Sequence, residues 1–426
     1  MNRHQAATLL ADVLRCDHAA GVHSTLGGLS RQEWDLVVEE AVRHRLAGIL
    51  YRRLHAAGSQ SPGSVPILDE LRDVAMRVCA RNLDLFSALG RVLDCLEKHG
   101  FAAIALKGLH LTSEVYADYA ARPMLDIDLL IKASDHLDAV RVLSSIGFHA
   151  GEAHRIDEWH ADPQRRHVVL NDGRVPLELH RSFVPTLQAD SAEIAGVWGR
   201  ARRVVLAGHP CLVLCPEDLI LHLCTHASLQ DAFGAGLLPC FDIAATIARY
   251  GDHLDWRAIV ERARQWRAER GVLLVLTLAR ELAGAAVPPG VLDADGYETM
   301  LAPARHRTCV LPEPGTLPSS TLARMVGPES PRAKVRLLLR SVFPRPRVIR
   351  KRYSVTSSAP GLLVGYVRHG ASLIHHHGRS AWRLLRRAPE TVETASVINN
   401  GQALRAWLDA EPMKGEAARL SEHPGD

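Results

Sequence analysis

The strongest constraint on the fold of this chain is a pair of aspartates inside an otherwise apolar run, MLDIDLLI at residues 124–131. In a β-strand, residues two apart point to the same face, so Asp126 and Asp128 project together while Ile127 and Leu129 face the core. A buried carboxylate is costly unless it is paired or binds a metal. Carboxylate oxygens suit Mg²⁺ or Mn²⁺, together with the oxygens of a bound phosphate. The pair therefore predicts a strand whose polar face holds a divalent cation.

A second alternation of apolar and polar residues, VPLELH at 175–180, offers a third carboxylate. Glu178 and His180 share one face of this expected strand, opposite two leucines. If the two strands are neighbours, Asp126, Asp128 and Glu178 form a two-metal site that activates an attacking hydroxyl and stabilises a departing phosphate oxygen. We predict that these three residues are both catalytic and metal-binding. A glutamate that simply faces solvent is the alternative for Glu178.

Residues that suit a phosphate flank the acidic strand. Lys107 and Gly108 stand at an expected strand-to-helix turn, where a glycine lets backbone N–H groups approach a phosphate and a helix N-terminus favours an anion. Lys107 and Arg122 could add positive charge beside a triphosphate. We predict that Lys107, Gly108, Arg122 and His180 are nucleotide-binding residues. The alternative for Lys107 and Arg122 is that both are ordinary surface charges.

The chain order predicts an α+β fold. Helical periodicity over residues 1–100 ends at Gly100, and strand and helix patterns then alternate up to a hairpin around Asn171-Asp172-Gly173. We expect a small mixed-sheet core with helical N-terminal and C-terminal extensions. The expected divisions are a helical region at 1–100, a catalytic core at 101–210, a helical domain at 211–300, a linker at 301–330, a basic helical region at 331–389 and a tail at 390–426.

These segments together resemble a known enzyme superfamily. The run LKGLHLTSEVYADYAARPMLDIDLLI at 106–131, the Gly-Phe pair at 147–148 and the run at 175–180 are similar to nucleotidyltransferases of the DNA polymerase β type. More narrowly, they resemble a poorly characterised bacterial nucleotidyltransferase family with a Lys-Gly signature. The likeness covers roughly residues 60–280. The Lys-Gly pair stands where the wider superfamily has Gly-Gly or Gly-Ser, which fits the narrower family.

The resemblance implies a minimal nucleotidyltransferase fold that moves a nucleoside monophosphate from an NTP substrate to an acceptor. It carries Asp126, Asp128 and Glu178 over as ligands of Mg²⁺ or Mn²⁺. Members of the family often accompany peptide natural-product pathways, and similar folds occur in toxins that modify tRNA. The acceptor is therefore left open between a peptide, a small molecule and tRNA. The rival hypothesis is a catalytically inactive scaffold or binding protein with the same fold.

The segment 331–389 carries fourteen Lys or Arg and no Asp or Glu, although the net charge of the whole chain is only +4. Such a stretch fits contact with a polyanion such as tRNA, or with an anionic membrane surface; a solvated helical face is the other interpretation. No apolar run approaches the roughly 20 residues that a membrane span requires. The N-terminus does not resemble a signal peptide, so we expect a cytoplasmic protein.

Two further clusters could hold a metal on spacing alone. Asp218, His222 and His226 follow one stripe of a helix, but a hydrogen-bonded histidine helix packed on the core is the simpler interpretation. A zinc site would combine Cys211, Cys215, Cys224 and His226. The spacing of these cysteines fits small buried residues better, and eight scattered cysteines without a CxxC pair are typical of reduced thiols.

Overall fold

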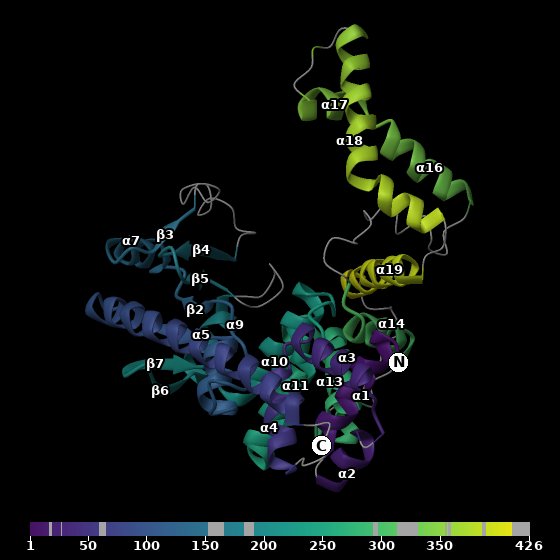
Figure 1. Cartoon of the computed structure of the whole chain (residues 1–426). Coiled ribbons are helices and arrows are strands. Elements are labelled where there is room, and N and C mark those ends of the chain that lie inside the picture. The colour runs from purple at the N-terminus through teal and green to yellow at the C-terminus, as the bar shows by residue number, and fades with distance from the viewer. Residues whose placement is uncertain are drawn as a thin grey trace, which may run out of the picture. The chain divides into compact units, whose positions relative to one another are not determined.

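The computed structural model of the chain forms two compact units, Met1–Leu301 and Ala302–Asp426 (Figure 1). It describes all residues except 17–18, 27, 59–64, 152–165, 183–190, 293–296, 313–330, 354–355, 357–358, 386–388 and 411–426. Most of the expected linker and the end of the expected tail therefore lie outside the described residues. The architecture is α+β, as predicted, with one mixed sheet and helical extensions on both sides of it in the sequence.

Five helices precede the sheet in the described part of the chain: α1 (Arg3–Arg15), α2 (Ala19–Leu26), α3 (Arg31–Arg43), α4 (Ala47–Ala56) and α5 (Val65–Lys98). Helices α1 and α3 begin with capping boxes, whose N-cap residues are Asn2 and Ser30. After the long helix α5, Gly100 takes up left-handed backbone at φ +75°, a conformation that glycine adopts without steric cost. The chain can therefore turn directly from α5 into the first strand.

The sheet contains seven strands in the spatial order β3-β4-β5-β2-β1-β7-β6. Their bounds are β1 (Ala103–Ala105), β2 (Ile127–Ile131), β3 (His149–Ala150), β4 (His167–Asn171), β5 (Pro176–His180), β6 (Arg202–Leu206) and β7 (His209–Val213). The pairs β2–β5 and β1–β7 are parallel, and the other pairs are antiparallel. The predicted hairpin is β4–β5, in which the Gly173 N–H donates to the Asn171 side chain at 2.6 Å.

Strand β2 separates an apolar layer from a polar face. Ile127 and Leu129 are fully buried in one cluster with Leu89 of α5 and Leu143 of α7 (His136–Ser145). Asp128 lies between them in the strand and points to the opposite face, as the alternation predicts. The apolar layer therefore anchors the strand, and the polar face is left for the site.

A helical group comprises elements inserted between strands and elements that follow the last strand, β7, in the sequence. Its members are α6 (Lys107–His110), η1 (Leu111–Val115), α9 (Ser191–Arg200), α10 (Pro216–Thr225), η2 (His226–Gln230), α11 (Leu238–Tyr250), η3 (Gly251–His253), α12 (Trp256–Gln265), α13 (Glu269–Ala283) and η4 (Pro289–Val291). Asp218, fully buried at the start of α10, accepts hydrogen bonds from Arg200 at 2.9 Å and Arg262 at 3.0 Å. These paired charges tie α9 and α12 to α10.

The described secondary structure of the second unit is helical. Its elements are α16 (Pro331–Val342), α17 (Pro346–Tyr353), α18 (Ala359–Leu385) and α19 (Pro389–Asp409), while α14 (Glu298–Cys309) spans the boundary between the units in the sequence. The Tyr366 hydroxyl donates to the Pro344 carbonyl at 2.6 Å, and the Tyr353 hydroxyl lies 3.0 Å from His369 Nδ1. These contacts hold α17 and the connection before it against α18.

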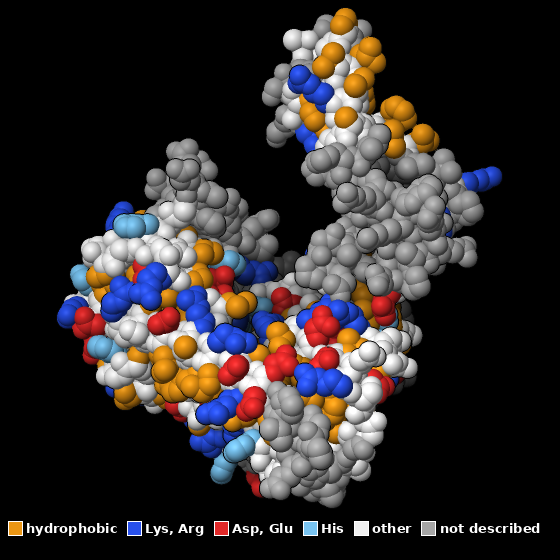
Figure 2. All heavy atoms as spheres, in the orientation of Figure 1, with side chains coloured by type: hydrophobic (Ala, Val, Ile, Leu, Met, Phe, Trp, Pro, Cys, Tyr) orange, Lys and Arg blue, Asp and Glu red, His pale blue; other side chains and the backbone are white. Residues whose placement is uncertain are grey.

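Exposed apolar side chains lie among the basic residues of this second unit (Figure 2). They are Leu339, Phe343, Val348, Leu363, Val364 and Val367. Exposed arginines on the same helices include Arg336, Arg340, Arg347, Arg350 and Arg368. Among the helices that the structure describes, none is both long enough and apolar enough to cross a membrane.

Candidate active site

The register of two parallel strands places two carboxylates side by side. Strand β2 pairs with β5 so that Asp128 stands opposite Glu178, and the Asp128 side chain is only 4% exposed. Asp126 comes just before β2, because the strand begins at Ile127, and it lies half-buried in the same pocket. The structure therefore brings the three predicted metal ligands together, but it places Asp126 on the loop that enters the strand rather than within the strand.

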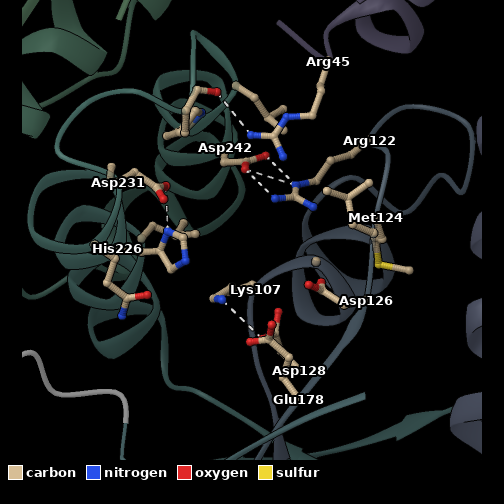
Figure 3. Close-up of a pocket in the computed structure, with 18 of the residues that line it drawn as sticks. Arg45, Lys107, Arg122, Met124, Asp126, Asp128, Glu178, His226, Asp231 and Asp242 are labelled. Carbon is tan, nitrogen blue, oxygen red and sulfur yellow. Dashed lines mark hydrogen bonds and ion pairs between the residues drawn. The ribbon is translucent and has the colours of Figure 1, made fainter. Parts of the chain in front are cut away.

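Two basic side chains contact the buried aspartate. Lys107 Nζ lies 3.2 Å from Asp128 Oδ1 (Figure 3). His180 Nε2 lies 2.8 Å from the same oxygen and 3.4 Å from Glu178 Oε2. Burial raises the pKa of Asp128, but Lys107 and His180 outweigh it and hold that pKa well below its ordinary value. Burial lowers the pKa of His180, yet its bonds to Asp128 and Glu178 leave that pKa raised.

Asp126 has the opposite electrostatic environment. Burial, together with repulsion from Asp128 and Glu178, raises the pKa of Asp126 to about 6. The pKa of Glu178 is lowered, chiefly by its hydrogen bond with His180. Asp128 and Glu178 are therefore compensated by neighbouring donors, whereas the ionised form of Asp126 is disfavoured. Added positive charge at this point would favour the carboxylate form of Asp126.

The Lys-Gly pair opens the short helix α6 directly after β1. Lys107, rather than the glycine, adopts left-handed backbone, with φ +39°. A Cβ atom at Gly108 would lie 2.9 Å from Met124 Cγ and 3.1 Å from Arg122 Nη1. A side chain at position 108 would therefore force Met124 and Arg122 to shift, because the segment before β2 packs directly against α6. The predicted contact of Lys107 and Gly108 with a nucleotide stays a prediction.

Arg122 is held by an acidic partner far away in the sequence. Its Nε and Nη2 each donate to the Asp242 carboxylate of α11 at 2.9 Å, a two-pronged pair. The Tyr116 hydroxyl donates to the same carboxylate at 3.0 Å. Burial lowers the pKa of Arg122, but Asp242 more than offsets this and leaves it raised. The pair ties the loop before β2 to the helical group, and the predicted nucleotide contact of Arg122 stays a prediction.

All seven predicted site residues line one pocket of about 470 Å³ in the first unit. The polar and charged lining residues that the sequence analysis did not single out are Arg45, His167, Gln230, Asp231 and Asp242. Asp242 carried a signal, because it interrupts an otherwise apolar helix in the run LPCFDIAATI. Arg45 carried none, since it is one of several arginines in the run RHRLAGILYRR.

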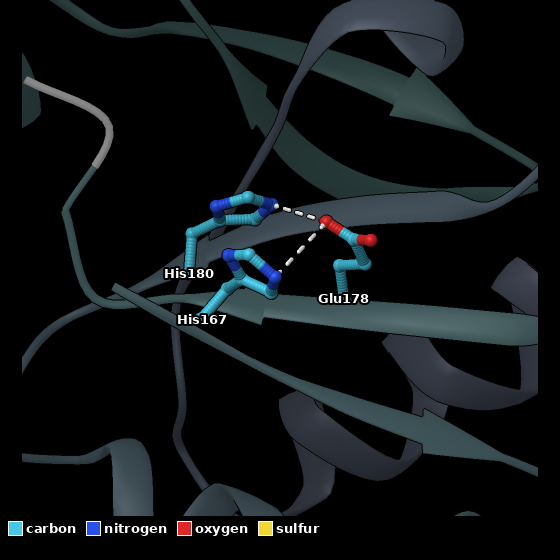
Figure 4. A group of neighbouring side chains, drawn as sticks. All are labelled: His167, Glu178 and His180. Atoms are coloured by element: carbon cyan, nitrogen blue, oxygen red, sulfur yellow. Dashed lines mark ion pairs between the residues drawn. The ribbon is translucent and has the colours of Figure 1, made fainter. Parts of the chain in front are cut away.

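A second group of metal-capable side chains shares Glu178. His167 of β4 and His180 of β5 pair across the hairpin, and with Glu178 they bring one ligand atom each to within 4.8 Å of one another (Figure 4). His167 Nε2 lies 3.9 Å from Glu178 Oε2, and burial lowers the pKa of His167. Imidazole ligands suit transition metals, whereas an all-carboxylate set suits Mg²⁺ or Mn²⁺. The pocket thus offers two sets of metal-capable side chains that share Glu178 and that prefer different kinds of metal ion.

The two further clusters that the sequence suggested, one of Asp218 with two histidines and one of cysteines with His226, do not form metal sites among the described residues, because their members contact different neighbours. Asp218 bonds to arginines of α9 and α12, and His226 Nδ1 lies 2.9 Å from Asp231 Oδ2. The cysteines are all free thiols, and burial raises the pKa of Cys211 and Cys215 to about 11. Neither cluster forms a metal-capable group within the part of the chain that the structure describes. Of these residues, His226 lines the pocket.

In the first unit, a mixed sheet carries in-register carboxylates on two parallel neighbouring strands beside a pocket lined by charged residues. A sequence model of the family described as "Uncharacterised nucleotidyltransferase" matches residues 30–284, more than half of the chain. The chain belongs to this family and is a transferase enzyme. A search of curated proteins found no match. The family match begins at the start of α3 and therefore includes the turn between α3 and α4. The resemblance described in the sequence analysis covered only roughly residues 60–280 and left this turn out.

Proposed function

We propose that this enzyme transfers a nucleoside monophosphate from an NTP to an acceptor, with Asp126, Asp128 and Glu178 as ligands of Mg²⁺ or Mn²⁺. The observation that carries the proposal is the register of β2 and β5, which sets Asp128 beside Glu178 under the pocket that Asp126 also lines. The roles of these three residues, like those of Lys107 and His180, rest on their placement together with the family.

The donor chemistry of the three residues fits a divalent cation. Carboxylate oxygens are the hard ligands that Mg²⁺ prefers, and a bound triphosphate supplies the oxygens that complete its shell. The pKa of Asp126 is raised by burial and by its acidic neighbours, so a bound cation at this point would favour its carboxylate form. A bound cation would supply Lewis acidity for the attacking and departing oxygens.

The residues of the chain would act on a balanced displacement. An acceptor oxygen or nitrogen forms a bond to the α-phosphorus, the bond from that phosphorus to the β-phosphate oxygen breaks, and pyrophosphate leaves while the acceptor proton passes to a base or to water. Lys107 and His180 position the Asp128 carboxylate through contacts of 3.2 Å and 2.8 Å. A positive charge beside the bound phosphates would also stabilise the negative charge that builds up on them in the transition state.

The competing hypothesis is an inactive scaffold, and ligand-dependent stability separates the two. A functional site should bind NTP with Mg²⁺, and a ligand at about a hundred times its Kd stabilises the native state by about 2.7 kcal/mol. We therefore expect the melting temperature of the full chain to rise by several degrees with at least one of the common NTPs. Thermal denaturation with Mg²⁺, and with a chelator as control, measures this. An unchanged melting temperature with every NTP would favour the scaffold.

The acceptor remains a proposal among a peptide, a small molecule and tRNA, and the segment 331–389 distinguishes these classes. If it contacts a polyanion such as tRNA, log Kd should vary with log salt by roughly 0.7–0.9 per phosphate contact. A five-fold variant, in which five basic residues are neutralised, should bind tRNA more weakly whatever the RNA sequence. Its log Kd should also vary less steeply with log salt. The residues to neutralise are Arg345, Arg347, Arg350, Lys351 and Arg352.

Fluorescence anisotropy with labelled tRNA from low to moderate salt measures this prediction. A charge-matched control neutralises exposed arginines of the first unit: Arg72, Arg77, Arg141, Arg257 and Arg264. Equal tRNA affinity for the wild type and the five-fold variant would contradict a nucleic-acid contact. If the segment binds anionic lipid vesicles instead, it contacts a membrane surface rather than a nucleic acid. The exposed apolar side chains of α16 and α18 suit such a contact.

A further inference from the structure

The Lys and Arg side chains that line the pocket differ in how their charge is compensated. Lys107 contacts Asp128 at 3.2 Å, and Arg122 forms a two-pronged pair with Asp242. Arg45 donates Nη2 to the Ala235 carbonyl at 3.2 Å, and no carboxylate among the described residues lies within ion-pair distance of it. Burial, followed by repulsion from Arg122, lowers the pKa of Arg45. Asp242, Asp231 and Asp126 attract Arg45 from beyond ion-pair distance but do not offset this, so Arg45 is a half-buried cation without a direct ion pair among the described residues.

The backbone at Arg45 is one that favours glycine. The residue lies in the turn between α3 and α4 with φ +61°, in the left-handed region. Helices commonly end with a residue in this conformation, and it is usually glycine because a Cβ atom is strained there. An arginine at such a position is unfavourable for the fold alone. Strained positions of this kind cluster where a side chain serves binding or catalysis.

The turn that carries Arg45 is fixed to the opposite wall of the pocket. The Leu237 N–H, just before α11, donates to His44 Nδ1 at 3.1 Å, and the Arg45 bond to Ala235 reaches the same loop. Helix α4 is also in close contact with the loop that leads into β2, since a Cβ at Gly48 would overlap the Ala120 carbonyl oxygen. The guanidinium is therefore held in place before any ligand arrives, on the side of Arg122 away from Lys107 (Figure 3).

We infer that Arg45 binds the β- and γ-phosphates of the nucleoside triphosphate, an inference that rests on the proposed function. The hydrogen bond to Ala235 leaves most of the guanidinium N–H donors available, and their planar fork matches phosphate oxygens. The acidic residues at the floor mark the place of the α-phosphate and its cation. The far end of the polyphosphate then extends toward Arg45 and supplies a counter-ion in direct contact, which the carboxylates of the pocket do not.

Arg45→Gly separates this role from a structural one, because glycine suits the backbone at this position. We expect the variant to be as heat-stable as the wild type or more so, and to bind NTP and inorganic tripolyphosphate about ten- to a hundredfold more weakly, the worth of a charge-assisted contact. Affinity for the corresponding NMP should stay within about twofold, because an NMP lacks the phosphates concerned. Arg45→Lys keeps the positive charge but lacks the planar fork of donors, so its affinity for NTP and tripolyphosphate should lie between those of the wild type and Arg45→Gly.

The matched control is Arg267→Gly, an exposed arginine that also has positive φ, +50°, after a helix but does not line the pocket. It should leave all affinities unchanged. Isothermal titration of the full chain with NTP, NMP and tripolyphosphate measures the set. Wild-type affinity for NTP and tripolyphosphate in Arg45→Gly would overturn the inference, as would loss of NMP binding to the same extent. If tripolyphosphate binding depends on Arg45 but the protein transfers no nucleotide, the inference about Arg45 holds and the proposed function is overturned.

Discussion

Replacing Asp128 with asparagine should abolish activity and also destabilise the metal-free protein, whereas Asp126→Asn should abolish activity without loss of stability. A lost metal ligand costs more than the roughly 10- to 100-fold lost with an outer-shell partner, so both variants should transfer nucleotide at least a hundredfold more slowly. The stabilities differ because Asp128 accepts bonds from Lys107 and His180, whereas at Asp126 burial and the neighbouring carboxylates outweigh the attraction of the same two side chains.

The expected sizes follow from the electrostatics of each residue. In Asp128→Asn the amide oxygen can still accept from His180, but the negative charge that pairs with Lys107 and His180 is lost, and hydrogen bonds to a charged group contribute about 1.5–3 kcal/mol. Asp126 has a pKa raised to about 6 by burial and acidic neighbours, so above that pH its charge opposes folding and a neutral amide relieves the repulsion. The free energy of unfolding of Asp126→Asn should therefore equal or exceed that of the wild type at pH 7.5.

Urea denaturation at pH 7.5 with chelator, beside an NTP-transfer assay with Mg²⁺, measures both quantities. Asp138→Asn, which removes an exposed carboxylate outside the pocket, is the control and should change neither. Equal stability changes in the Asp126 and Asp128 variants would contradict the charge distribution described for the site. Retained transfer in either variant would contradict its role as a metal ligand.

Asp242→Ala should have the largest effect on stability, about 3–5 kcal/mol, because it leaves the Arg122 guanidinium buried without its partner. The Arg122 side chain is only 12% exposed, so water cannot replace the lost carboxylate well. Denaturant unfolding measures the loss. Asp231→Asn breaks a pair with His226 that is about a quarter exposed and should cost at most about 1 kcal/mol.

A double variant tests whether the unpaired Arg122 guanidinium causes the loss of stability in Asp242→Ala. Arg122→Met with Asp242→Leu removes both charges and should be clearly more stable than Asp242→Ala, since replacing a whole buried pair by apolar residues is often neutral. A double variant as unstable as Asp242→Ala would show that lost packing, rather than an unpaired charge, governs the effect. A loss below about 1 kcal/mol in Asp242→Ala itself would contradict the burial of this pair.

Sequence patterns predicted the features that depend on local periodicity. The alternation around Asp128 placed Ile127 and Leu129 in the core, and the turn residues before Val175 predicted the β4–β5 hairpin. The strand that pairs with the acidic strand was also predicted, from the alternation of apolar and polar residues around Glu178. These inferences hold because a strand period and a tight turn are set by residues close together in the chain.

Features that depend on distant contacts could not be predicted. The partner of Arg122 lies on α11, and Arg45 reaches the pocket from a turn before α4; neither pairing leaves a local pattern. The strained backbone at Lys107 and Arg45 is likewise imposed by the packing of whole elements. Asp126 falls outside the strand, because the ladder with β5 starts at Ile127, and a period of two does not determine where a ladder starts.

The most direct test of nucleotidyl transfer follows the position of a label in the NTP. The full chain is incubated with Mg²⁺ and either α-labelled or γ-labelled NTP, with tRNA, peptides and small-molecule extracts as acceptors. We predict that α-label moves onto an acceptor, that γ-label leaves in pyrophosphate, and that a chelator or Asp126→Ala with Asp128→Ala stops both. Label from the γ-position on the acceptor, or α-label transfer that survives the double substitution, would contradict transfer by this carboxylate site.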